Sequence, residues 1–380
     1  MLLHSRRSFL ARTLGAGWLG ASLLDRAVLR AAQARAEAPD APQDLFDIEK
    51  VAEGVYAAIA KPVAMINCNA AIFENSDNLL IVDTHSKPSA AAALVAQLRS
   101  FNHKQVRYVV NTHFHFDHTG GSSGYRRIAR HADIISSTAT RNSMADFAGT
   151  GFKRLLEMVS KGIEDSEKQL AAAKSPREKE HAQQNIREGR AFLAEMQDAS
   201  FALPNITFDQ NLIIHDKASE LHLAFRGRGH TSGDIIVFSP DKKVLASGDL
   251  LHGWLPYIGD GYPREWPRTL RALAEFPFEH VIGGHGAVQH TRERLPQVAA
   301  YIEELTEAVS QGKHKGRTVA QLQETITPAT LKSLASGGYG EYVAAETVKY
   351  YFDAALGTPA EALAGGIKEN VASTFKALEK

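Results

Sequence analysis

The stretch that decides the fold covers residues 111–121 and reads Asn111-Thr112-His113-Phe114-His115-Phe116-Asp117-His118-Thr119-Gly120-Gly121. It follows the apolar run 106–111, which predicts a buried strand, and it ends in a glycine-rich turn. In an extended backbone His113 and His115 project to the same side, and Asp117 and His118 follow where the chain turns. Imidazole and carboxylate are ligands that zinc-type divalent ions accept. A solvated polar loop is the alternative, but the buried strand in front of these side chains favours a metal site.

Outward from this stretch, short β-rich runs alternate with helical patterns from about residue 46 to residue 286. Residues 70–74 and 79–83 are apolar runs on either side of Asn75-Ser76-Asp77-Asn78, an arrangement typical of a hairpin. Helical spacing is present over 87–101 and 267–276. Further strands are predicted at 134–136, 212–215, 221–226, 234–239, 243–247 and 280–282. Strands and helices that interleave in this way predict a layered α/β fold.

Two helical segments interrupt or extend this plan. Ser175-Pro176-Arg177-Glu178 is a capping box with proline at the first helical position, so we expect a helix to start there. Residues 143–198 therefore predict an inserted helical hairpin with a solvated surface; a lid over a cleft is the functional alternative. Residues 292–380 predict a helical C-terminal extension with breaks at Gly337-Gly338 and Gly365-Gly366.

Composition limits the classes of function. Of the 380 residues, 44% are hydrophobic and 23% are charged, which is ordinary for a globular protein and excludes a disordered chain. Cys68 is the single cysteine, so neither an intramolecular disulfide nor a cysteine-rich zinc module can form. Residues 1–36 hold six arginines and one aspartate, which leaves 37 basic and 42 acidic residues in the rest of the chain. Because a mildly acidic protein binds polyanions poorly, we expect a small-molecule substrate and no nucleic-acid partner.

The N-terminus resembles a twin-arginine export signal. Arg6-Arg7 stands before an apolar run at 10–24, and Ala34-Arg35-Ala36 supplies the small residues that a signal peptidase reads. We expect residues 1–36 to be this signal, read by the twin-arginine export machinery, and residues 37–48 to be a linker. The mature chain would then be periplasmic or secreted. Because the apolar run is too short to cross a membrane, no membrane span is expected in the mature chain. An amphipathic helix of the fold is the alternative.

The stretch quoted first resembles the H-x-H-x-D-H signature of the metallo-β-lactamase superfamily. Three further motifs follow in the order that this family requires: Gly229-His230-Thr231-Ser232-Gly233-Asp234, Ser247-Gly248-Asp249 and Gly283-Gly284-His285-Gly286. The resemblance covers about residues 51–286, and the 143–198 segment and the helical tail lie outside its strong part. It implies an α/β fold of the four-layer αββα sandwich type at 49–291, which contains the inserted hairpin and precedes the helical extension at 292–380.

Carried over position by position, the resemblance implies a site for two divalent metal ions. The expected ligands are His113, His115 and His230 for the first metal, Asp117, His118 and His285 for the second, and Asp249 as a bridge between them. Two such cations lower the pKa of a shared water toward neutrality and polarise the carbonyl under attack. The resemblance makes Asp117 the catalytic residue that orients this water and moves its proton. Zinc is the expected metal, and iron and manganese are the alternatives.

The superfamily hosts many reactions on one scaffold. Asp249 stands where many zinc β-lactamases have a cysteine, and this resembles the glyoxalase II, lactonase and general hydrolase branches. We therefore expect a periplasmic hydrolase that attacks an acyl carbonyl with a metal-bridging hydroxide. Its substrate would be a lactone, a β-lactam-like compound or another small ester or amide. The alternatives are a glyoxalase II-type thioesterase and a persulfide dioxygenase with one iron.

Other residues near the expected site stay open. Asp83 ends a predicted strand and resembles an acid that recurs in the family, and His85 and His252 also follow predicted strands. Each of the three is a candidate for orienting a metal ligand. Four aromatic residues follow Asp249 and either line a substrate cleft or pack the next helix: Trp254, Tyr257, Tyr262 and Trp266. The oligomeric state is also open.

Overall fold

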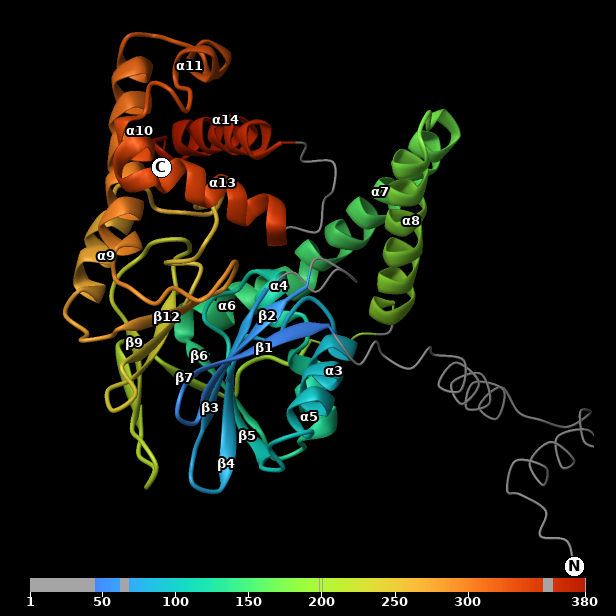
Figure 1. Ribbon diagram of the computed structural model, residues 1–380, viewed down its shortest axis with the longest axis vertical. Helices are drawn as coiled ribbons and strands as arrows, with labels where there is room; N and C mark the ends of the chain where they lie inside the picture. The colour runs from blue at the N-terminus through green and yellow to red at the C-terminus, as the bar shows by residue number, and fades with distance from the viewer. Residues whose placement is uncertain (1–44, 62–67, 198, 200, 351–357, 380) are drawn as a thin grey trace, which may run out of the picture. The chain divides into compact units, whose positions relative to one another are not determined.

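A computed structural model describes residues 45–61, 68–197, 199, 201–350 and 358–379 (Figure 1). The twin-arginine stretch and most of the expected linker lie outside these residues. The linker expected at 37–48 is wrong at its end, because strand β1 (Phe46–Ala52) already begins at Phe46. Its first residue pairs with Ala60 of the antiparallel strand β2 (Val55–Ala60), so residues 46–48 belong to the fold.

In the described part of the chain, the first sheet holds seven strands that lie in chain order. After β1 and β2 come β3 (Ala70–Glu74), β4 (Asn78–Val82), β5 (Gln105–Val110), β6 (Asp133–Ser137) and β7 (Ile206–Phe208). Strands β1 to β4 are antiparallel neighbours, whereas β4 to β7 are parallel. The carboxyl ends of β4 and β5 therefore meet at one edge of the sheet, where the quoted stretch begins.

The second sheet has the order β12-β11-β10-β9-β8. Its strands are β8 (Asn211–Ile214), β9 (Leu221–Phe225), β10 (Ile235–Ser239), β11 (Val244–Gly248) and β12 (His280–Gly283). Only β11 and β12 among these pair in parallel. A hydrogen bond from Ile235 N to Thr112 O, 2.9 Å long, connects the start of β10 to the loop that follows β5. The two sheets are thus joined at the edge that carries the histidine motifs of the sequence.

Four layers form the core. Alternate residues of both sheets, among them Val55, Phe73 and Val110 from the first and Leu223 and Val237 from the second, make one buried cluster between the sheets. Helices α3 (Pro88–Leu98) and α5 (Ser122–Ile128) lie beside the first sheet, and α9 (Trp266–Leu273) and α10 (Arg294–His314) lie beside the second (Figure 1). The predicted α/β sandwich of helix, sheet, sheet and helix layers is confirmed.

The inserted segment forms an antiparallel helical hairpin. Its helices are α7 (Phe152–Ala172) and α8 (Pro176–Met196), and they follow α6 (Thr138–Asp146) and a short π-helix, η1 (Phe147–Gly151). The capping box at Ser175 and Glu178 is present, so α8 begins where the sequence predicts. The two helices approach closely at Gly189, where an added Cβ would lie 2.7 Å from Ile163 Cγ1.

The C-terminal helices share a hydrophobic core with the outer face of the second sheet. After α10 they are α11 (Val319–Thr325), α12 (Lys332–Ala335), α13 (Tyr339–Tyr350) and α14 (Pro359–Ala377). The chain does turn at Gly337 and Gly338, which both have positive φ. The break expected at Gly365-Gly366 is wrong, because α14 continues through both residues. In the parts that the structure describes, no helix combines the length and the apolar composition of a membrane span.

Candidate metal centre

Four loops at the edge of the sheets bring the predicted metal ligands together. The first follows β5 and contains the short helix α4 (Phe116–Thr119). The others carry His230 before β10, Asp249 after β11 and His285 after β12. Hydrogen bonds hold these loops in register; for example, Gly284 N donates to Gly248 O over 2.9 Å. Residues that are far apart in sequence therefore meet at the ends of neighbouring strands.

Three histidines form the first group of potential ligands. His115 Nδ1 lies 3.2 Å from His113 Nε2 and 2.8 Å from His230 Nε2. Burial and the neighbouring His115 lower the pKa of His230 to about 3, and burial also lowers the pKa of His113 well below its usual range. The neutral imidazole is the form that binds a metal ion. The three nitrogens lie close enough to one another to share one cation, and burial favours the metal-binding form of His113 and His230.

A second group contains Asp117, His118 and His285. Asp117 Oδ2 lies 3.5 Å from His118 Nε2 and 3.3 Å from His285 Nε2. Burial alone would lower the pKa of His285, but the carboxylates of Asp249 and Asp117 raise it to about 9. The same carboxylates raise the pKa of His118. A cation bound here would compete with protons for these ring nitrogens.

Asp249 lies between the two groups. Its Oδ1 is 3.3 Å from His118 Nε2, and its Oδ2 is 3.4 Å from His230 Nε2 and 3.3 Å from His285 Nε2. Two of these atoms, His118 Nε2 and Asp249 Oδ1, are buried and have no hydrogen-bond partner among the described residues. Buried polar atoms are normally satisfied, and a cation bound by both would satisfy them. The side chains present thus fit a pair of divalent ions.

All seven side chains that the sequence predicts as ligands lie in this one cluster. Their role as metal ligands stays a prediction, and so does the catalytic role of Asp117. The geometry also shows which ring nitrogen of each histidine faces the other ligands. This is Nδ1 in His115 and Nε2 in the other four histidines, His113, His118, His230 and His285.

Hydrogen bonds from outside the cluster orient His118 and His230. Asp83 Oδ2 accepts a hydrogen bond from His118 Nδ1 over 2.8 Å, and its carboxylate also accepts one from Thr112 N over 2.9 Å. Asp83 has a φ of 65°, a left-handed conformation that costs energy for a residue other than glycine. His230 Nδ1 donates to the carbonyl oxygen of Tyr257 over 3.1 Å. Such partners fix the ring orientation and raise the basicity of a ligand.

Asp260 contacts a predicted ligand, and the sequence analysis missed it. Its Oδ2 lies 3.0 Å from His115 Nε2, the ring nitrogen that faces away from the other ligands. It belongs to the loop between β11 and α9 and is separated from His115 by 145 residues. No spacing or motif in the sequence signals this contact, because it depends on how the loop packs.

The other histidine candidates divide into two cases. For His85, Nδ1 is 2.8 Å from the carbonyl oxygen of Cys68, and burial lowers the pKa of this histidine to about 4. His252 contributes indirectly, because its Nδ1 accepts a hydrogen bond from Trp254 N over 3.0 Å. The ring of Trp254 stacks on His285, with 4.1 Å between the ring centres. His252 thus helps to place an aromatic wall beside a ligand.

Two further aromatic residues after Asp249, Tyr257 and Trp266, differ in how deeply they are buried. Tyr257 is 42% exposed and its ring lies about 6 Å from those of His115 and His230, so it belongs to the rim of the site. Trp266 is fully buried and packs the start of α9, where its Nε1 donates to Leu250 O. Trp266 therefore packs the following helix, as one of the two alternatives has it, and whether Tyr257 contacts a substrate stays a prediction.

Gly284 is needed for the close packing of the site. A Cβ at this position would lie 2.1 Å from Asp249 Oδ1 and 2.6 Å from His118 Cε1. Any larger residue would therefore displace two predicted ligands at once. This contact gives a physical reason for the paired glycines before His285.

The C-terminal helices support the loops that carry the site. Asn370 of α14 donates to the carbonyl oxygen of Pro256 over 2.7 Å and to the hydroxyl of Tyr301 over 3.0 Å. Glu346 of α13 accepts a hydrogen bond from Ala287 N over 2.7 Å, two residues after His285. The helical tail is therefore part of the structure that positions the predicted ligands.

Comparison of the sequence with known protein families identifies the family of the chain. A sequence model described as the metallo-β-lactamase superfamily matches residues 65–285, which is more than half of the chain. The chain belongs to the metallo-β-lactamase superfamily. The segment 143–198 lies inside the matched range, and the helical tail at 292–380 lies outside it.

Among curated proteins, the chain is 25% identical over 282 residues to the linear primary-alkylsulfatase of Pseudomonas sp., a match that covers 67% of this chain and 49% of the relative. It is 26% identical over 125 residues to the metallo-β-lactamase type 2 of Elizabethkingia meningoseptica, covering 28% of this chain and 50% of that protein. The chain thus spans about half the length of these relatives. Among solved structures, the metallo-β-lactamase from Pontibacter korlensis is 16% identical, with a TM-score of 0.47, and the match covers 67% of this chain and 98% of that one.

Proposed function

We propose that the protein is a hydrolase that uses two divalent metal ions to cleave an ester or amide bond in a small molecule. The observation that carries this proposal is the position of Asp249, whose two oxygens face histidines of different groups. A carboxylate in this position can bind two cations at once, which is the arrangement of two-metal hydrolytic sites. Membership of the superfamily supports the same reaction class.

The chain's own residues have separable tasks in this reaction. Bound cations would supply a hydroxide nucleophile near neutral pH and polarise the bond under attack. The three histidines around His115 would hold one cation, and Asp117, His118 and His285 would hold the other, with zinc as the proposed metal. Outside this set, Asp83, Asp260 and the carbonyl oxygen of Tyr257 keep three ligand rings in place.

Asp117 is the proposed catalytic base. Its side chain is 28% exposed, compared with 7% for Asp249, so Asp117 is the carboxylate that water and substrate can reach. Although burial opposes ionisation, His118 and His285 lower the pKa of Asp117 below its usual range. The ionised carboxylate can therefore accept a proton from the attacking water and return it to the leaving group.

Two substrate classes follow from different observations. The aspartate at position 249 favours an acyl substrate, such as a lactone, a β-lactam-like compound or another small ester or amide. The similarity to a linear primary-alkylsulfatase over 67% of the chain favours a sulfate ester as the second candidate. A thioesterase of the glyoxalase II type and a mono-iron persulfide dioxygenase are the further alternatives that the experiment below separates.

Location in the periplasm or outside the cell is part of the same proposal. It is supported by Arg6-Arg7 and the apolar run that follows. Residues 1–36 fused to a folded reporter should export it through the twin-arginine route, and replacing both arginines by lysine should stop export. Export of the doubly substituted fusion would remove the support for this location.

The deciding experiment combines metal analysis with a substrate panel. Protein purified without added metal should contain about two equivalents of a zinc-type metal per chain, whereas one equivalent of iron would favour the dioxygenase. The panel consists of a chromogenic cephalosporin, a homoserine lactone, an acyl thioester and an aryl sulfate. At saturating zinc, Asp117→Asn should lower kcat on the accepted substrate by about 100-fold or more. Full activity of this variant would remove Asp117 from the mechanism, and failure of the whole panel would reject the hydrolase.

A further inference from the structure

Phe116 stands between two predicted ligands, His115 and Asp117, and its ring is the centre of an aromatic group. Four other rings have their centres between 5.9 and 6.3 Å from that of Phe116. We call these five residues the phenylalanine cluster: Phe116 from the loop after β5, Phe147 from η1, Phe152 from α7, Phe192 from α8, and Phe201. The inserted hairpin therefore contacts the loop that carries these predicted ligands through aromatic side chains.

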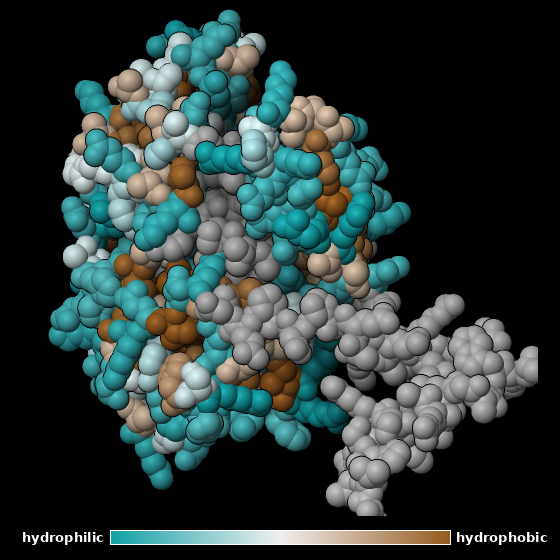
Figure 2. All heavy atoms as spheres, turned by 45° about the vertical axis from the view of Figure 1, so that its right-hand side comes forward, coloured by the Kyte–Doolittle hydropathy of each residue, from teal (hydrophilic) through white to brown (hydrophobic). Residues whose placement is uncertain are grey.

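The cluster is not a closed core. Phe192 is buried, but the other four members are only half-buried. Helix α7 has a single buried residue, Ser166, although Leu155, Leu156 and Val159 follow Phe152 at helical spacing. Met158 on the same helix is 65% exposed. Figure 2, in which the hairpin side of Figure 1 is turned forward, shows hydrophobic side chains in several places among hydrophilic ones. The fold thus leaves apolar surface that begins at the metal loop.

The backbone around Phe147 is built to hold this ring in place. Residues 147–151 form a π-helix, which is rare and is frequent at functional sites. A Cβ on Gly151 would lie 2.3 Å from Phe147 Cδ2, so only glycine at 151 allows the ring its position. An irregular helix would be an unusual way to place a ring that served packing alone.

The site therefore has two chemically different ends. One consists of imidazoles and carboxylates, and the other consists of phenylalanine rings, with no charged member. We propose that the phenylalanine cluster binds an apolar tail of the substrate, an alkyl or acyl chain attached to the bond that is cleaved. The proposal rests on the proposed function for the position of that bond, and it adds a substrate class: esters with an extended hydrocarbon chain.

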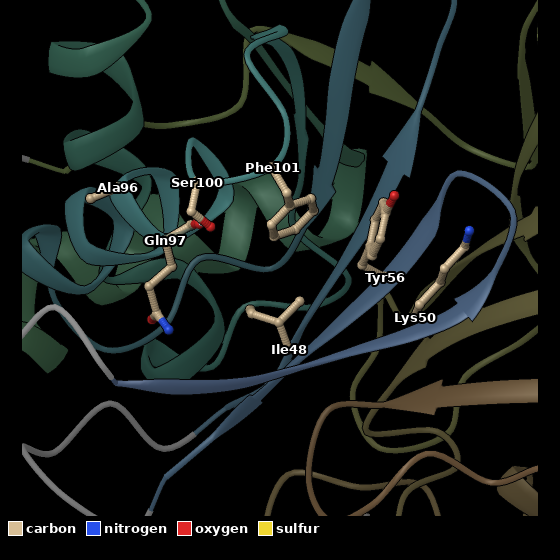
Figure 3. Close-up of a pocket in the computed structure, with 7 residues that line it drawn as sticks. All are labelled: Ile48, Lys50, Tyr56, Ala96, Gln97, Ser100 and Phe101. Carbon is tan, nitrogen blue, oxygen red and sulfur yellow. The ribbon is translucent and has the colours of Figure 1, made fainter.

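A second aromatic surface offers a matched control. Tyr56 and Phe101, with 5.1 Å between their ring centres, line a groove of about 610 Å³ between β1, β2 and α3 (Figure 3). Phe101 is 47% exposed, and none of the residues that line this groove belongs to the metal centre or contacts its ligands. Phe101→Ala therefore removes an exposed ring without touching the proposed subsite.

The test is a chain-length series measured on the zinc-loaded protein. Aryl esters of saturated acids with two to twelve carbons, and the corresponding alkyl sulfates, report kcat/KM. We expect kcat/KM to rise about twofold to fourfold for each added methylene until the cluster is filled. Phe152→Ala and Phe147→Ala should each reduce the ratio between the longest and the shortest substrate by about tenfold, since a lost ring contact removes apolar burial. Phe101→Ala should leave this ratio as it is in the unaltered protein.

Binding gives a second readout that does not require turnover. The affinities of alkylphosphonates with two to ten carbons, measured by calorimetry, should show the same dependence on chain length and the same loss in Phe152→Ala. A dependence on chain length without hydrolysis of any ester would reject the proposed function and support the subsite. Hydrolysis of short esters with no dependence on chain length in either assay would overturn the subsite and leave the function in place.

Other occupants of this surface predict different results. If Phe152→Ala changes the oligomeric state in light scattering, or abolishes binding to phosphatidylglycerol vesicles, while the chain-length ratio stays unchanged, the cluster is a contact surface for a second copy or for a lipid. Either result would overturn the substrate-tail proposal.

Discussion

Asn370→Ala tests whether the helical tail positions the metal centre. Asn370 is 3% exposed and its amide donates two hydrogen bonds, to Pro256 O and to the hydroxyl of Tyr301. Alanine removes both bonds and leaves a buried carbonyl without its donor, which costs about 1–3 kcal/mol in addition to about 1 kcal/mol for the second bond. We therefore expect the free energy of unfolding to fall by about 2–4 kcal/mol. The next residue, Tyr257, holds His230 through its carbonyl oxygen, so zinc affinity should fall by about 10-fold to 100-fold.

Leu322→Ala is the matched control. Leu322 is 1% exposed, belongs to the same C-terminal core and packs against Gly312 of α10 rather than against the loops of the site. Its truncation should cost a similar 2–4 kcal/mol. Urea unfolding followed by circular dichroism gives the stability of each variant, and competition with a zinc chelator gives the affinity, both at a temperature at which both variants are folded. If the two variants lose stability equally and Asn370→Ala keeps the zinc affinity of the control, the tail does not position the site.

Three further outcomes are expected. Gly284→Ala should abolish zinc binding, because the added Cβ would lie 2.1 Å from Asp249 Oδ1. The control Gly162→Ala, where an added Cβ would have no atom within 4 Å, should bind zinc normally and raise the free energy of unfolding by up to about 1 kcal/mol. Equal zinc content in the two variants would contradict the close packing at Gly284. Asp83→Asn, which weakens the acceptor for His118 Nδ1, should lower zinc affinity by about 10-fold to 100-fold in the same competition assay, and an unchanged affinity would show that this contact does not tune the ligand. Removal of metal with a chelator should lower the melting temperature. Zinc at 100 times its dissociation constant should then raise the free energy of unfolding by about 2.7 kcal/mol. A melting temperature that does not change with zinc would exclude a metal site in the folded protein.

Local patterns in the sequence were enough for much of the fold, whereas the full set of seven predicted ligands came from the resemblance to a known family. The spacing of His113, His115, Asp117 and His118 behind a buried strand specifies ligand chemistry within one short segment, and the capping box at Ser175 specifies where α8 begins. These features depend on backbone geometry and on residue type over a few positions, so they are visible without tertiary contacts. Gly365-Gly366 shows the limit of such reasoning, because packing against the core keeps α14 helical through two residues of low helix propensity.

Contacts between distant segments were decided only by the tertiary structure. Asp260 meets His115 across 145 residues, and Asn370 meets Pro256 across 114. The phenylalanine cluster likewise gathers four rings from later parts of the chain around Phe116 of the metal loop. No spacing rule links such pairs, because each depends on the path of a loop and on the packing of side chains that the fold brings within reach. The residue types that can bind metal could therefore be recognised in the sequence. The residues that orient these predicted ligands, and the apolar surface beside the ligands, depend on how the layers of the fold pack.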